Sequence, residues 1–141
     1  MITVEYGLSI TLDLPYEKAV AEVRAALKEQ GFGVLTEIDV QATMREKLDA
    51  DMEPYVILGA CNPSLAHRAL AADRMIGLLL PCNVVVRVAD GERSVVQALD
   101  PRVLIELPER EELRPVAEEA GKRIRAALDR LTTAALRRSG G

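Results

Sequence analysis

Two Cys-Asn dipeptides are the stretches of this chain whose residue types point most directly to chemistry. Cys61-Asn62 lies in GACNPSLAH (59–67) and Cys82-Asn83 lies in LLPCNVVV (79–86), and the sequence contains no other Cys or Asn. A cysteine thiol can act as a nucleophile, as half of a redox pair or as a ligand for a soft metal ion. The two dipeptides are therefore where an activity should be sought.

The first motif places a thiol at the start of a predicted helix. Asn is a preferred N-cap residue and Pro the preferred first helical residue, so Asn62-Pro63 predicts that a helix over residues 64–72 begins directly after Cys61. A helix N-terminus lowers the pKa of a nearby thiol by stabilising the thiolate. His67 falls about one turn into this helix and is a candidate acid–base partner for Cys61. The alternative is a surface or half-buried histidine without a role in catalysis.

The second motif begins a predicted strand that starts near residue 79. Pro81 lacks a backbone donor, which favours a strand start, an edge or a bulge at Cys82. If this strand pairs antiparallel with the apolar strand 55–61, the two thiols frame one cavity. We then expect Cys61, Asn62, His67, Cys82 and Asn83 to line a ligand site, although Asn83 has no structural role that the sequence explains.

Both cysteines are also compatible with roles that need no ligand. They could be ordinary core residues, because free Cys is among the most buried residue types. A disulfide is less expected in a reducing cytoplasm. The spacing predicts no metal site of the usual kind, because CxxC and HxxxH are absent and two Cys with one His give three ligands at best. No phosphate-binding, dinucleotide-binding or GxSxG pattern is present, so no cofactor is assigned.

The elements that position these motifs follow from hydropathy patterns. A strand, continuous or bulged, is expected over residues 2–14, and a helix from Pro15 that ends at Gly31. Further predicted elements are a strand over 32–38, a short helix capped by Asp39, and a hairpin turn at 89–92. A long helix is expected over about 112–136, with a loose tail over 137–141. The resulting order, β-α-β-α-β-α-β-β-α, predicts a single α+β domain with an antiparallel-rich sheet and helices packed on one face.

Composition excludes several classes of function. The chain has 141 residues, a net charge of −4 and 3% aromatic residues, with a pI near 5.1. An acidic chain with few aromatic rings is a poor binder of nucleic acid. No apolar run reaches the length of a membrane span, and the N-terminus alternates like a strand. We therefore expect a cytoplasmic protein with neither nucleic acid nor membrane as partner.

The motifs together resemble a known family. GFGVLTEID, the Lys-Leu of EKLDAD, LGACNP, LLPC and DP occur in the order found in domain of unknown function family 302, over about residues 5–105. The resemblance implies a compact α+β domain similar to the TATA-binding-protein fold, a homodimer, and recurrence of both motif cysteines. It implies no reaction, and the C-terminal helix is expected to be less typical of the family.

Two functions from different classes remain. The first is a homodimeric binding or regulatory module whose pocket near the Cys-Asn motifs takes a small molecule or a soft metal ion. The second is a thiol-dependent redox or transfer enzyme, with Cys61 as nucleophile and Cys82 as resolving thiol.

Overall fold

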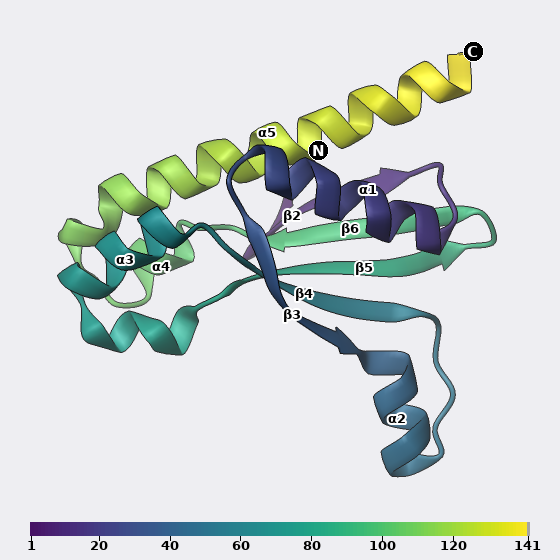
Figure 1. Ribbon diagram of the computed structural model, residues 1–141, viewed down its shortest axis with the longest axis horizontal. Coiled ribbons are helices and arrows are strands. Elements are labelled where there is room, and N and C mark those ends of the chain that lie inside the picture. The colour runs from purple at the N-terminus through teal and green to yellow at the C-terminus, as the bar shows by residue number, and fades with distance from the viewer. Residues whose placement is uncertain (141) are drawn as a thin grey trace.

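The fold is an α+β arrangement built on one six-stranded antiparallel sheet (Figure 1). The computed structural model describes the backbone of residues 1–140 and the side chains of residues 1–133. The strand order is β1-β2-β6-β5-β4-β3. The strands are β1 (Ile2–Val4), β2 (Gly7–Leu12), β3 (Gly33–Asp39), β4 (Tyr55–Cys61), β5 (Cys82–Asp90) and β6 (Arg93–Leu99). The predicted α+β class and the antiparallel sheet are confirmed.

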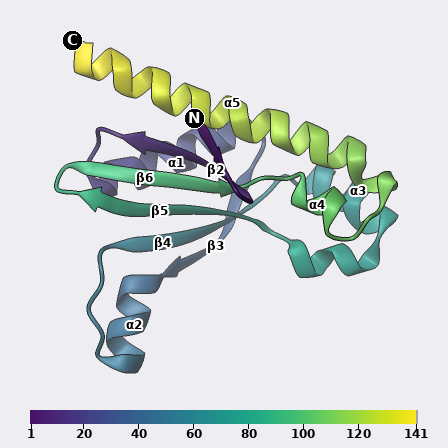
Figure 2. The ribbon, with the colours of Figure 1, turned by 180° about the vertical axis from the view of Figure 1, so that it is seen from behind.

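Within residues 1–140, α-helices and short 3-10 helices connect or cover these strands. The α-helices are α1 (Tyr16–Glu29), α2 (Val40–Leu48), α3 (Pro63–Ala72), α4 (Val103–Glu106) and α5 (Arg114–Gly140), and the 3-10 helices are η1 (Arg74–Leu79) and η2 (Glu111–Leu113). Helices α1 and α5 lie across one face of the sheet, whereas α2 projects from the β3 edge (Figures 1 and 2).

The main core fills the space between the sheet and helices α1 and α5. Alternate residues of β2, β4, β5 and β6 point toward α1 and α5, and Leu58, Val86 and Val96 are fully buried. A second apolar cluster, with Leu65, Ile76 and Leu113 among its members, joins α3, η1, α4, η2 and the start of α5 beyond the end of the sheet. The two clusters meet beside the ends of β4 and β5, where the cysteines lie.

Several local predictions are confirmed. Helix α1 follows Pro15, and Gly31 ends it with a left-handed φ of 83°, after which the Phe32 N–H donates to the Leu27 carbonyl at 3.0 Å. The Asp39 side chain accepts from the Ala42 N–H and caps α2. The hairpin between β5 and β6 turns at Gly91, as the Asp-Gly signal predicts.

Three segments differ from the prediction. The first strand is a hairpin, because the chain reverses at Glu5, whose φ is 48°, and β1 folds back on β2. Strand β5 begins at Cys82, not near 79, because residues 74–79 form η1 capped by the Asp73 side chain. In β3 the register shifts between Val34 and Thr36, so the strand that is expected over 32–38 is interrupted by a bulge and its alternation of faces breaks there.

The C-terminal helix is longer than predicted. It runs from Arg114 to Gly140, so it continues through most of the segment expected to be a loose tail, and residue 141 lies outside the described residues. Within the described part of the chain, no helix combines the length and the apolar character that crossing a membrane requires.

Candidate functional site

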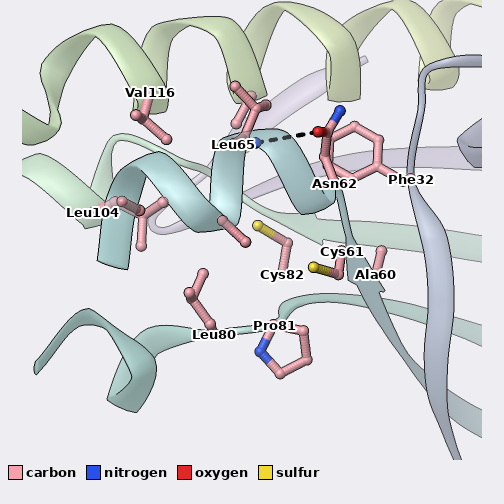
Figure 3. Close-up of a pocket in the computed structure, with 13 residues that line it drawn as sticks. Phe32, Ala60, Cys61, Asn62, Leu65, Leu80, Pro81, Cys82, Leu104 and Val116 are labelled. Carbon is pink, nitrogen blue, oxygen red and sulfur yellow. Dashed lines mark hydrogen bonds between the residues drawn. The ribbon is translucent and has the colours of Figure 1, made fainter. Parts of the chain in front are cut away.

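The two Cys-Asn motifs meet at one end of the sheet. Strands β4 and β5 pair antiparallel with Ala60 opposite Cys82, so the last residues of β4 face the first residues of β5. The sequence-based expectation that these two strand ends are neighbours is confirmed. Both sulfur atoms point into the space between α3 and the Leu80–Pro81 segment (Figure 3). Both thiols are free.

Asn62 holds the helix that forms one wall of this space. Its side-chain oxygen accepts from the Leu65 N–H at 3.2 Å, and Pro63 is the first residue of α3. The predicted helix cap is therefore confirmed, and Asn62 is 8% exposed. Because the cap fixes where α3 begins, it fixes the wall of the space against Cys61.

The space between the motifs is a small apolar cavity of about 30 Å³. Apart from the two thiols and Asn62, its walls are carbon-rich, and they include Phe32, Ala60, Leu65, Leu80, Pro81, Leu104, Val116 and Ala120. Sites for organic ligands usually measure about 300–1,000 Å³, whereas about 10–15 Å³ suffices for one water molecule. In this conformation the cavity accepts an occupant of atomic size and excludes an organic molecule.

The two thiols differ in their surroundings. Cys61 is half-buried, and Cys82 is 8% exposed. Burial raises the pKa of the Cys82 thiol to about 11, and the neighbouring Cys61 adds to the rise. Cys82 is therefore protonated at neutral pH and is a weak nucleophile unless something displaces its proton.

His67 does not belong to this site. It is exposed on α3, whose buried residues are Leu65 and Ala69, and it is not among the residues that line the cavity. Residues 65 and 69 are one turn apart and define the inward face, so position 67 points away from them. The predicted role of His67 as an acid–base partner to Cys61 is therefore wrong for this conformation.

Asn83 lies on the other face of the sheet. Successive residues of a strand point to opposite faces, and Cys82 and Val84 are buried while Asn83 is exposed. Asn83 lines a separate groove with Tyr55 and Gln97. Of the five predicted site residues, the structure thus brings together Cys61, Asn62 and Cys82.

No larger set of ligating side chains surrounds the thiols. Among the residues whose side chains are described, no group of three His, Cys, Asp or Glu is placed to hold a metal ion. The sequence does not predict several residues that line the cavity. They come from four separate segments and are Phe32, Leu80, Leu104 and Val116. Phe32 alone carries a signal, because a side chain that directly follows the stop of α1 is placed to pack back on its last turn.

Asp100 is more buried than its position beside an apolar run indicates. It is 2% exposed, and Arg102 contacts it with its backbone N–H at 3.0 Å and its Nε at 2.9 Å. Burial alone would raise the pKa of the Asp100 carboxyl, but the hydrogen bonds and charge of Arg102 outweigh burial and lower it. Asp100 is thus a paired structural anion that fixes the exit from β6.

Comparisons with known proteins agree with this architecture. Residues 8–131 match the model of the family described as "Domain of unknown function DUF302", a range that extends past the expected core of 5–105 and includes much of α5. The crystal structure of an uncharacterized conserved DUF302 protein from Bacillus stearothermophilus is similar, with a TM-score of 0.83 and 29% identity. The match covers 91% of this chain and 99% of that one. The comparison with curated proteins finds no match. Because the family model spans most of the chain, the protein belongs to the DUF302 family.

Proposed function

We propose that this protein is a homodimeric binding module that holds a soft monovalent metal ion, of the Cu(I) type, between Cys61 and Cys82. The observation that carries the proposal is that both sulfurs open into one apolar cavity with room for an atom-sized occupant. Thiolate sulfur is the ligand that Cu(I) prefers in proteins. Two thiolates satisfy a soft monovalent ion, which accepts linear two-coordinate geometry, whereas zinc sites need more ligands.

The walls of the cavity favour this occupant over the small molecule that the sequence left as an alternative. An organic ligand would have to displace Leu65 or Leu104, which are 6% and 3% exposed and belong to the second apolar cluster. A metal ion bound by two thiolates needs no such displacement. The apolar surroundings also limit the access of water to a bound Cu(I) ion.

Titration with Cu(I) under anaerobic conditions, in competition with a chromophoric Cu(I) chelator, tests the proposal. We expect one Cu(I) per chain, and loss of at least about 100-fold in affinity for Cys61→Ser and for Cys82→Ser, since even outer partners of a metal site are worth that much. The Cys82 thiol must lose its proton before the sulfur binds the ion. Below the raised pKa of Cys82, this one deprotonation should make the affinity for Cu(I) rise about tenfold per pH unit.

The matched control is His67→Ala, which removes the chain's single histidine from a surface position outside the cavity. It should bind Cu(I) like the unmodified protein. Unchanged binding in both cysteine variants, or no binding by the unmodified chain, would contradict the proposal.

A thiol-dependent redox activity is the second candidate, and one observation favours it: a half-buried thiol lies beside a buried one. In that reaction Cys61 attacks hydrogen peroxide and forms a sulfenic acid with release of water. Cys82 then attacks that sulfur, forms the disulfide and releases a second water, so that the thiols lose two hydrogens overall. Mass spectrometry after peroxide treatment separates the two functions. Rapid, complete disulfide formation supports the redox pair, and slow over-oxidation of Cys61 alone counts against it.

We place the interface of the proposed homodimer in a different part of the molecule, the arm formed by β3 and α2. Helix α2 has nine residues and buries none of them, while Leu35, Ile38 and Leu48 are 68%, 49% and 70% exposed. Helices shorter than about 12–15 residues are marginal in water on their own, so a packing partner over the exposed apolar side chains would stabilise this arm. A second copy of the chain is the occupant that we assign to it.

A further inference from the structure

A groove with a partly polar lining lies on the sheet face opposite the cysteines. It has a volume of about 510 Å³ and spans outward-facing positions of β4, β5 and β6. The turn between β1 and β2 closes one end of it, with Glu5 and Tyr6 on its rim. This turn is anchored, because the Asp100 N–H donates to the Tyr6 carbonyl at 2.9 Å. The volume falls within the range of small-molecule sites.

Two amide side chains face this groove with unused hydrogen-bonding groups. No other described side chain bonds to the Asn83 amide, and the Gln97 amide only donates to Ser9 Oγ at a long 3.4 Å, which leaves its oxygen free. Asn is disfavoured in strands, and no hydrogen bond to another described side chain accounts for Asn83 at this position. An amide carries a donor group and an acceptor side by side, so it pairs with another group that has the same arrangement.

The other residues that line the groove indicate the shape and charge of a ligand that would fit it. Tyr6 and Tyr55 contribute aromatic rings, and Val85 contributes an apolar floor between the amide and Tyr55. Glu5 is the only ionisable carboxyl or amine on the lining, and no described side chain pairs with it. The groove therefore favours a ligand that is flat, largely apolar and not negatively charged.

We propose that this groove binds a neutral planar heterocycle that carries a carboxamide or an equivalent donor–acceptor edge, which pairs with the Asn83 amide. The ring of the ligand lies over Val85, within reach of the two tyrosines. The site is independent of the metal site, because β4 and β5 separate the groove from the thiols and no cysteine lines it. It also gives Asn83 a role that the sequence leaves unexplained.

The experiment is a titration of ¹⁵N-labelled protein followed by NMR, with nicotinamide as the probe. We expect saturable shifts of the Asn83 and Gln97 side-chain amide signals, with an affinity in the millimolar range because the probe is small. Nicotinate has the same shape with a carboxylate in place of the carboxamide. It should bind about three- to fivefold more weakly, because it lacks the donor and meets Glu5.

Asn83→Ala should reduce the affinity for nicotinamide by at least about fivefold, which corresponds to one exposed hydrogen-bonded contact. The matched control is Gln30→Ala, which removes an amide that does not line the groove. It should bind like the unmodified chain. Asn83 is exposed, so its variant should fold, and the dispersion of its spectrum checks this.

Three results would overturn the proposal. The first is no saturable shift of the Asn83 amide with nicotinamide at its solubility limit. The second is equal affinity in Asn83→Ala and the unmodified protein. The third is a change of the groove signals on dilution of the protein with none on addition of nicotinamide, which would assign the groove to contact with a second copy of the chain.

Discussion

At the scale of single residues, Asn62 serves both the fold and the candidate metal site. Its oxygen caps α3, and its amide nitrogen lies against Gly31, where an added Cβ would come within 2.9 Å of it. Gly31 in turn ends α1 with a positive φ. The start of one helix and the stop of another are thus packed together beside the thiols, so a change at Asn62 acts on both.

We predict that Asn62→Ala lowers the free energy of unfolding by about 1 kcal/mol, because the Leu65 N–H loses its acceptor. Urea denaturation measures this. Asn62→Asp keeps the accepting oxygen and should recover most of the loss. A change near zero for the alanine variant, or an equal loss in both variants, would mean that the cap contributes nothing.

The five residues that the sequence assigns to the site show how far the sequence determines it. The expected antiparallel pairing of the ends of β4 and β5, which brings Cys61 near Cys82, is confirmed, and so is the role of Asn62 as a helix cap. The direction in which each side chain points is harder to predict. His67 fails because the inward face of α3 is set by Leu65 and Ala69, and Asn83 fails because a strand turns neighbouring residues to opposite faces. Both signals are present in the sequence once the phase of each element is known.

At the scale of elements, one close contact joins β3, β4 and the segment before β5. A Cβ added at Gly59 in β4 would clash with the Thr36 hydroxyl and come within 2.8 Å of Pro81 Cγ. Thr36 lies directly after the register shift in β3, and Pro81 directly precedes Cys82. The absence of a side chain at residue 59 therefore lets both neighbours approach the end of β4.

We predict that Gly59→Ala destabilises the protein by about 1–3 kcal/mol, since the proline ring cannot rotate out of the way. The matched control is Gly33→Ala at the start of β3, where an added Cβ meets nothing within 4 Å. Thermal and urea unfolding of both variants provide the comparison. Equal stability of the two variants would show that this packing is not tight.

The elements themselves are predictable where the local signal is strong. The Pro15 start and Gly31 stop of α1, the Asp39 cap and the Asp-Gly hairpin are all confirmed. The β1–β2 hairpin escapes prediction because it turns at Glu5 with a positive φ and not at a glycine. The 3-10 helix η1 is not predicted because its last two residues, Leu78 and Leu79, belong to an apolar run that continues into Leu80 and also fits a strand. Similarity to the TATA-binding-protein fold stays a prediction.

At the scale of the whole molecule, assembly is the prediction that matters most. We expect sedimentation velocity at micromolar concentration to show a species of twice the 15.4 kDa chain. Leu48→Glu on the arm should shift it toward the monomer, because a charge would enter the apolar contact. Leu78→Glu is the matched control, since Leu78 is 79% exposed on η1, away from the arm. A monomer in the unmodified chain would rule out the dimer, and equal effects of both changes would rule out the arm as its interface.

The place of β2 in the sheet has a consequence for how the chain reaches its folded state. Strand β2 pairs with β6, and the Ser94 hydroxyl donates to the Leu14 carbonyl across 80 positions of sequence. Contacts between distant segments close large loops, which slows folding. During synthesis, the apolar face of the β1–β2 hairpin stays uncovered until most of the chain has left the ribosome, because its partner strand β6 is made late. The nascent N-terminus is therefore the stretch that most needs protection from aggregation.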